Sequence, residues 1–203
     1  MKKIKIAVTG GIGSGKSEFC RYLSEKGELV ISADNVAKEL LNSDEKIKKK
    51  ITDTFGTGVY ESGVLNVKYL AEKVFTDEKN VRKINSIVHP AAIAEINRKA
   101  DEILQTGNIV FVESALIFEA GMEEIFDYII LITSDEETRI DRVVRRDDVN
   151  RDEVIQRMQN QMSDEKKKQY SDFTVHNNLS VEDLKNKADF FINLFKTICT
   201  SDQ

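Results

Sequence analysis

The sequence is poor in several kinds of residue, and each shortage excludes a class of protein. Its 203 residues include one proline, two cysteines, two histidines and no tryptophan. A single proline leaves no room for a proline-rich linker, and two cysteines cannot build a disulfide framework or a cysteine-based zinc site. Two histidines argue against a multi-histidine metal site.

Long apolar runs and an excess of basic charge are also absent from the sequence. No stretch approaches the roughly 18 apolar residues of a membrane span, and the apolar part of the N-terminus is too short for a signal peptide. Thirty Lys and Arg against thirty-five Asp and Glu give a net charge of -5, so a polyanion must be held by a local cluster. We expect a cytoplasmic protein with no membrane and no nucleic-acid partner.

The composition that remains is that of a folded domain. Apolar residues make up 40% and charged residues 32% of the chain, which excludes disorder. A length of 203 residues fits one domain, or one domain with an inserted lobe.

The first 41 residues predict a β-α-β unit. Residues 4–8 form a short apolar run that ends at glycines, as a buried strand does. A helix is expected over 16–26 with Gly27 as its stop, then a strand over 29–32 and a helix through Leu41. Such a unit calls for a parallel sheet.

The middle of the chain differs from both ends. Residues 44–100 show helical patterns and no convincing strand, with Thr76 capping one helix and Pro90 in the first turn of the next. The pattern indicates an all-helical insert. Apolar strands return at 109–112 and 128–132, with a weak one at 173–175. We therefore predict an α/β fold with a doubly wound, parallel, five-stranded sheet flanked by helices.

Three later helices carry N-terminal capping signatures. Ser134 precedes Glu137 and Asn150 precedes Glu153 by three residues, and the two helices they start flank the break Asp147-Asp148-Val149. Ser180 caps the last helix.

Four of the ten glycines lie within residues 10–15, in the segment GGIGSGKS. The segment matches the phosphate-binding pattern G-x4-G-K-[ST] through Gly10, Gly15, Lys16 and Ser17. A chance match arises about once in 30,000 starting positions. Glycines let backbone N–H groups surround phosphate oxygens, Lys16 reaches the β- and γ-phosphates, and the Ser17 hydroxyl ligates Mg²⁺. A strand before the match and a helix after it predict a nucleoside-triphosphate site.

A GTPase switch is one alternative, because two segments match its motifs. Asp53 begins a D-x-x-G match and Asn186 an N-K-x-D match. Those motifs belong at the ends of buried strands, whereas both segments lie in helical patterns. We interpret both as chance matches.

Arginines are concentrated between residues 139 and 157. Arg139, Arg142 and Arg146 are spaced i, i+3 and i+7, on one helical face. Guanidinium groups suit phosphate oxygens and a phosphoryl-transfer lid needs them, so we predict phosphate contact for Arg142 and Arg146. For three others we expect a solvated face paired with Asp141, Asp147, Asp148 and Asp152; these are Arg145, Arg151 and Arg157.

Asp34 closes the second predicted strand, beside the phosphate-binding loop. Ligands of open α/β sheets bind outside the carboxyl ends of the strands. Asp34 could accept a hydroxyl proton or hold Mg²⁺ through water. It could also cap the helix that begins near Asn35, and the two roles are compatible.

The ordered set of segments resembles the dephospho-CoA kinase family over nearly the whole chain, from Ile6 to about Leu184. The matching segments are VTGGIGSGKS, VISADNVAKEL, SGVLNVKYLAEKVF with INSIVHP, ESALIFEAG, RVVRRDDVNRDEVIQRMQNQ and YSDFTVHNN. The first is common to many proteins, but the ordered set is specific. The sequence departs from the family pattern at a few positions, namely Glu113, Ala115, Val67 with its neighbour Lys68, Ser171 and Asn178.

The resemblance implies ATP-dependent phosphorylation of the ribose 3′-hydroxyl of dephospho-CoA, with Mg²⁺. Lys16, Arg142 and Arg146 would act on the phosphates, Ser17 would ligate the metal, and Asp34 would take the hydroxyl proton. The ATP contacts would come from Gly11, Ile12, Gly13, Ser14, Gly15, Lys16, Ser17 and Asn177. His89 would contact the acceptor, unless it caps a helix before Pro90. Glu119 would orient substrate or cap a helix.

The resemblance also implies how the chain is divided. The core would comprise residues 1–43, 106–138 and 170–203, the acceptor-binding insert about 44–105, and the lid about 139–169. We expect a monomer, with self-association left open. The alternatives are another P-loop kinase acting on a nucleoside or nucleotide, and a nucleotide-dependent switch without catalysis.

Overall fold

The computed structural model describes residues 1–74 and 77–201 and divides the chain into two compact units. Residues 1–32 and 99–203 make the first unit, and residues 33–98 make the second. Each unit has an apolar core of its own. The predicted cap at Thr76 lies outside the described residues.

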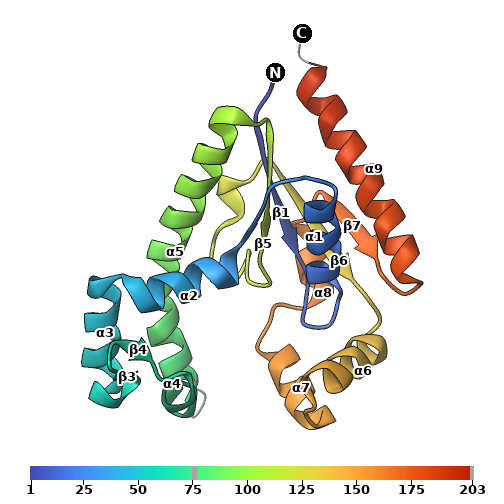
Figure 1. Cartoon of the computed structure of the whole chain (residues 1–203). Coiled ribbons are helices and arrows are strands. Elements are labelled where there is room, and N and C mark those ends of the chain that lie inside the picture. Colours follow the sequence, from blue (N-terminus) through green and yellow to red (C-terminus); the bar gives the residue numbers. More distant parts are fainter. Residues whose placement is uncertain (75–76, 202–203) are drawn as a thin grey trace. The chain divides into compact units, whose positions relative to one another are not determined.

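The first unit is built on a parallel sheet of five strands (Figure 1). The strands are β1 (Ile4–Thr9), β2 (Val30–Ser32), β5 (Ile109–Glu113), β6 (Tyr128–Thr133) and β7 (Phe173–His176), in the order β2-β5-β1-β6-β7. All four neighbouring pairs are parallel, and Val8 near the end of β1 pairs with Glu113 and Ile130. The predicted sheet is confirmed.

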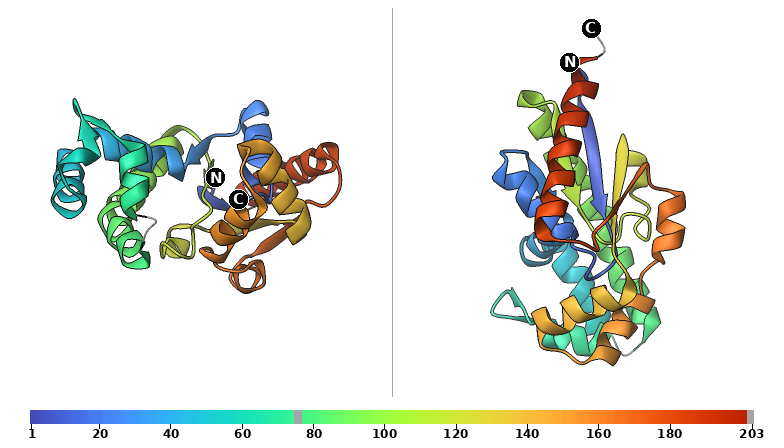
Figure 2. Two further views of the ribbon diagram at one scale, coloured as in Figure 1. Left: turned by 90° about the horizontal axis from the view of Figure 1, so that it is seen from below. Right: turned by 90° about the vertical axis from the view of Figure 1, so that its right-hand side faces the viewer.

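Helices cover both faces of this sheet. Ile4, Ile6 and Val8 share one apolar cluster with residues of α1 (Lys16–Glu25) and α9 (Val181–Thr200), and Figure 2 shows α9 beside β1. Lys5 points to the opposite face, because successive strand residues alternate. There it forms an ion pair with Asp101 (2.6 Å), near the end of α5 (Glu78–Thr106). The sheet is therefore doubly wound.

The second unit is mostly helical. It contains α2 (Ala33–Ser43), α3 (Glu45–Phe55), the 3-10 turn η1 (Thr57–Val59), α4 (Val67–Val74) and most of α5. Its core gathers apolar side chains from these elements, among them Ile51, Phe55 and Val88.

The expectation that this region holds no strand is wrong. A hairpin joins β3 (Tyr60–Glu61) to β4 (Val64–Leu65) through Ser62 and Gly63, both with positive φ. Two such residues form the tight turn that hairpins favour. Strands of two residues are too short to show an alternating pattern, which is why the sequence did not indicate them.

Two further expectations in this unit are also corrected. Pro90 does not stand in a first turn, because α5 runs through it as one helix from Glu78 to Thr106. His89 therefore does not cap a helix. Asp34 is not the last residue of a strand or an N-cap, since α2 begins at Ala33 and Asp34 lies in its first turn.

The helical caps of the first unit agree with the sequence at two of three positions. Asn150 accepts a hydrogen bond from Glu153 N (2.9 Å) at the start of α7 (Arg151–Gln159), and Ser180 caps α9. Ser134 is not a cap, because α6 (Glu136–Asp147) starts after Asp135. The Ser134 hydroxyl instead lies within hydrogen-bonding distance of Asn177 O (2.9 Å).

The remaining elements of the first unit are η2 (Glu123–Ile125) and α8 (Asp164–Gln169).

In the parts of the chain that the structure describes, no helix combines the length and the apolar character needed to cross a membrane. The two GTPase-like matches lie in helices, Asp53 in α3 and Asn186 in α9, which supports their interpretation as chance matches.

Candidate active site

The glycine-rich loop joins the end of β1 to the start of α1. Gly13 (φ 79°) and Gly15 (φ 96°) adopt left-handed backbone, and Gly15 is the N-cap residue of α1. A Cβ atom at Gly13 would overlap the backbone of Arg139, and one at Gly15 would overlap the Asn177 amide. Only glycine fits both positions, so the loop is shaped by backbone conformation and by close packing together.

A cavity of about 250 Å³ lies against this loop. Its lining combines the loop with two arginines of α6, and consists of Gly11, Gly13, Gly15, Lys16, Ser17, Glu18, Arg142, Val143 and Arg146. Lysine, two arginines and the N-terminus of α1 give the cavity a positive field that favours phosphate oxygens. The structure thus brings together most of the residues that the sequence assigned to the phosphates.

Arg142 contacts backbone carbonyls of the glycine-rich loop and of the segment after β7. Its Nη2 donates to Asn177 O (2.9 Å), and its Nη1 lies 3.3 Å from Ser134 Oγ and 3.4 Å from Gly13 O. Asn177 in turn donates from Nδ2 to Ser14 O (2.9 Å) and is almost fully buried. These bonds fasten the end of β7 to the glycine-rich loop.

Arg146 is held far less tightly than Arg142. Its side chain is 60% exposed, and Nε and Nη2 donate to the Asp147 carboxylate (2.7 and 3.0 Å). These hydrogen bonds lower the pKa of Asp147 below its usual range. Arg157 pairs with the same carboxylate (3.3 Å), as expected, whereas Arg151 pairs with Glu137 (2.5 Å) rather than with one of the aspartates proposed for it.

Ser17 and Glu113 meet at the end of the sheet. The Ser17 hydroxyl donates to Glu113 Oε1 (2.5 Å), and Glu113 ends β5, where it pairs in register with Val8 and Ser32. Within residues 1–74 and 77–201, no group of three or more His, Cys, Asp or Glu side chains is arranged to hold a metal ion. A cation at this point would need oxygen ligands from the hydroxyl, the carboxylate, phosphates and water.

Asp34 and His89 belong to the second unit. Asp34 follows Ser32, the last residue of β2, by two positions in the chain. His89 is half-buried in α5, and burial lowers the pKa of its imidazole below the usual value. A neutral ring at physiological pH can both donate and accept a hydrogen bond.

Glu119 makes contacts that its sequence context did not indicate. It lies in the turn after β5, outside any helix, so it is not a helix cap. Its Oε1 accepts from Met162 N (2.8 Å) and forms an ion pair with Lys167 Nζ (3.1 Å). Lys167 is fully buried and also donates to Ala115 O (2.7 Å). The pair fastens this turn to α8.

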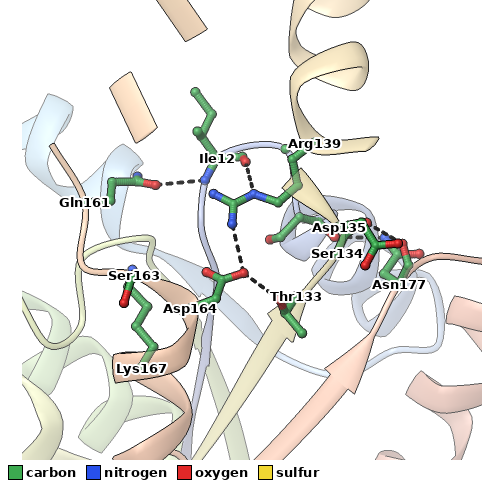
Figure 3. A network of polar contacts seen from close by, with 12 residues as sticks. Ile12, Thr133, Ser134, Asp135, Arg139, Gln161, Ser163, Asp164, Lys167 and Asn177 are labelled. Atoms are coloured by element: carbon green, nitrogen blue, oxygen red, sulfur yellow. Dashed lines mark hydrogen bonds and ion pairs between the residues drawn. The ribbon is translucent and has the colours of Figure 1, made fainter. Parts of the chain in front are cut away.

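Three residues that sequence reasoning missed are joined to the loop in the network of Figure 3: Arg139, Gln161 and Asp164. Arg139 was placed on the face of Arg142 and Arg146 but given no role. Gln161 and Asp164 follow α7, and nothing in their local pattern indicates contact with residues more than 20 positions away.

A doubly wound sheet, a glycine-rich loop around a helix N-terminus and arginines over that loop define a P-loop kinase. The model of the family "Dephospho-CoA kinase" matches residues 4–183. The chain belongs to the dephospho-CoA kinase family and is therefore a phosphotransferase.

Individual relatives and solved structures agree with this assignment. A dephospho-CoA kinase of Salinibacter ruber is 39% identical over 90% of this chain and 93% of its own, and one of Fusobacterium nucleatum is 33% identical over 92% and 95%. The solved dephospho-CoA kinase of Campylobacter jejuni has a TM-score of 0.72, at 25% identity over 98% of both chains. A shikimate kinase of Acinetobacter baumannii, 14% identical with a TM-score of 0.56 over 96% of this chain and 94% of its own, shares the fold. The family predicted from the sequence is confirmed, and the nucleoside or nucleotide kinase alternative is not supported.

Proposed function

We propose that the chain transfers the γ-phosphoryl group of ATP to the ribose 3′-hydroxyl of dephospho-CoA, with the residues described above as the machinery. One observation carries the proposal: Lys16, Arg142 and Arg146 line the same cavity as the glycines of the loop. Catalysis of phosphoryl transfer consists mostly of positioning and charge stabilisation, and these groups supply both.

The loop and Lys16 would bind the ATP phosphates. Backbone N–H groups at the start of α1 point along a helix dipole that favours anions, and the Lys16 ammonium adds a full charge. Two hydrogen bonds from side chains to backbone carbonyls fix the shape of this region, from Asn177 to Ser14 O and from Arg142 to Asn177 O. Asn177 would contribute to the adenine side of the site, as the family resemblance implies.

Ser17 and Glu113 fit a magnesium ion. Mg²⁺ prefers oxygen ligands and is bound through one or two protein groups, phosphates and water. The Ser17 hydroxyl and the Glu113 carboxylate are 2.5 Å apart, so both oxygens are available at one point beside Lys16. When bound there, the ion would neutralise charge on the phosphates.

Asp34 would act as the general base. Its carboxylate would take the proton of the 3′-hydroxyl while that oxygen forms a bond to the γ-phosphorus, and the bond from phosphorus to the β-phosphate oxygen would break to release ADP. Residues of the insert, about 44–105, would hold the acceptor, with His89 as a contact there. Glu119 would help orient the acceptor by fixing the turn after β5.

The segment from about 139 to 169 would act as a lid. Arg142 and Arg146 would stabilise charge on the transferring group, and closure over ATP would exclude water. We expect a monomer in the cytoplasm, and the two buried free thiols, Cys20 and Cys199, support a reducing compartment.

An assay that couples ADP release to a spectroscopic signal tests the proposal. Dephospho-CoA would be compared with a panel of nucleosides and nucleoside monophosphates, each with ATP and Mg²⁺, and the product would be identified by mass spectrometry. We expect turnover with dephospho-CoA and a phosphate ester at the ribose 3′ position. Faster turnover of a nucleoside or nucleotide would overturn the proposed acceptor, and ATP hydrolysis without transfer would overturn the kinase mechanism.

A further inference from the structure

Arg139 is a buried arginine that the mechanism above does not use. Its side chain is only 9% exposed, and its Nη1 forms an ion pair with Asp164 (2.8 Å). Asp164 Oδ2 also accepts from the Thr133 hydroxyl (2.5 Å), at the end of β6 (Figure 3). Burying an ion pair costs desolvation free energy, which is offset only when the geometry and the hydrogen bonds of the pair are good.

The contacts of Arg139 fall on three successive residues of the glycine-rich loop. Its guanidinium fills the space where a side chain at Gly11 would lie. Its Nε donates to Ile12 O (3.0 Å), and its own backbone lies against Gly13. One arginine of α6 therefore contacts three successive residues of the loop.

Two further contacts fix Ile12, so that its N–H, its carbonyl and its side chain all have partners. Its N–H donates to Oε1 of Gln161 (2.9 Å), two residues after the end of α7. Its side chain packs against the small apolar cluster of Ile140, Val143 and Val154, which joins α6 to α7. The N–H, the carbonyl and the side chain of Ile12 are thus bound by the expected lid segment, and its N–H is not free for a phosphate in this arrangement.

We propose that Arg139, together with Asp164 and Gln161, is a positioning group that sets the glycine-rich loop for phosphate binding. Fixing both peptide groups of Ile12 limits the rotation of the neighbouring peptides, whose N–H groups must face the phosphates. Preorganised donors bind more tightly because they lose less entropy when the ligand arrives. The inference rests on the proposed function, in that the loop is taken to hold nucleotide phosphates.

Titration calorimetry with ADP and Mg²⁺, together with thermal unfolding, tests this inference on the full chain. The variants are Arg139→Met, the double variant Arg139→Met/Asp164→Asn, and Arg151→Met as the matched control. Arg151 is an exposed residue of the same lid segment and pairs with the exposed Glu137, so its loss should change neither quantity. ADP reports on the nucleotide side of the site, because it needs no acceptor.

We expect Arg139→Met to weaken ADP binding about tenfold or more, because a loop that is no longer held in place loses more conformational freedom when the ligand binds. It should also lower Tm, because Asp164 is left buried without its partner. The double variant removes that charge and should recover much of the Tm while ADP binding stays weak. A structural role would instead make affinity recover together with Tm.

Two results would overturn the inference. One is an ADP affinity of folded Arg139→Met within about twofold of the parent, which is less than a single lost hydrogen bond. The other is recovery of affinity in the double variant. If the parent itself failed to bind ADP, the proposed function would fail, and that result is separate from both.

Discussion

The two ends of α6 present the same residue type in opposite settings. Arg139, near the start, has 9% of its side chain exposed and is bound to Asp164 and to the backbone of the loop. Arg146, two turns and about 10 Å further along, is 60% exposed and pairs with its neighbour Asp147. Both lie on one helical face, so periodicity alone does not separate an arginine that holds the protein together from one that can move to a ligand.

The difference lies in what each guanidinium would lose on moving. Exposed ion pairs contribute little to stability, so Arg146 can exchange Asp147 for a phosphate at small cost. Breaking a buried pair leaves a charge without compensation, which fixes Arg139 in place. The buried end of α6 is suited to shape the site, and the exposed end is suited to act in it.

Lys16→Ala should have the largest effect, because it removes the cation that neither end of α6 can replace. We expect turnover close to background, since a preorganised charge at the phosphates is lost in the transition state. The measurement is steady-state kinetics with dephospho-CoA, alongside thermal unfolding. Near-normal turnover in a folded variant would remove the phosphate-site assignment.

Asp34→Asn should have the next largest effect. It tests a group proposed to act on the acceptor, whereas the arginines of α6 are proposed to act on the phosphates or on the loop. The amide keeps the size of the side chain but takes no proton, so we expect kcat to fall about 10²–10⁴-fold. The KM for ATP should change little, because Asp34 is proposed to act on the acceptor. A kcat within about threefold of the parent would contradict a general-base role.

Arg146→Ala tests the exposed end of α6 directly. We expect kcat to fall about 10–100-fold, below the 10³–10⁵-fold range of arginine fingers, because the parent side chain must first leave Asp147. Arg146→Lys should also be defective, since an ammonium cannot bind two phosphate oxygens through a planar fork.

Arg157→Ala is the matched control for this experiment, because Arg157 shares Asp147 but lies outside the lining of the loop cavity. It should leave kcat nearly unchanged. Full activity of Arg146→Lys would mean that positive charge alone is sufficient, and the proposed clamp would be wrong.

Lys167 is a second buried cation, like Arg139. Lys167→Met should change the free energy of unfolding more than it changes kcat. Loss of the ammonium leaves the Glu119 carboxylate without its ion-pair partner, so we expect the free energy of unfolding to fall by about 3 kcal/mol. Urea denaturation measures this, with Lys168→Met as the control on the exposed side of α8. Equal stability of the two variants would show that the buried pair is not stabilising.

Features that depend on short stretches of chain could be predicted from the sequence, and those that depend on distant partners could not. The glycine-rich loop, the strand before it and the cap at Asn150 are set by residues a few positions apart. Arg139 and Asp164 are 25 residues apart, and their meeting depends on how the segments after β6 fold back. Ser134 had the pattern of a cap, but its hydroxyl is held by the segment after β7 instead.

The contact between Lys2 and the last turns of α9 has a practical consequence for any labelled or immobilised form of the enzyme. Lys2 N donates to Cys199 O (3.2 Å), so the last turns of α9 return to the start of β1 (Figure 2). Lys2 and the end of α9 therefore lie where the strands of the sheet begin. The glycine-rich loop follows the other end of β1, about 20 Å away along a six-residue strand. Fluorophores or surface attachments placed at Lys2 or in the last turns of α9 would therefore lie far from the glycine-rich loop and leave nucleotide access open.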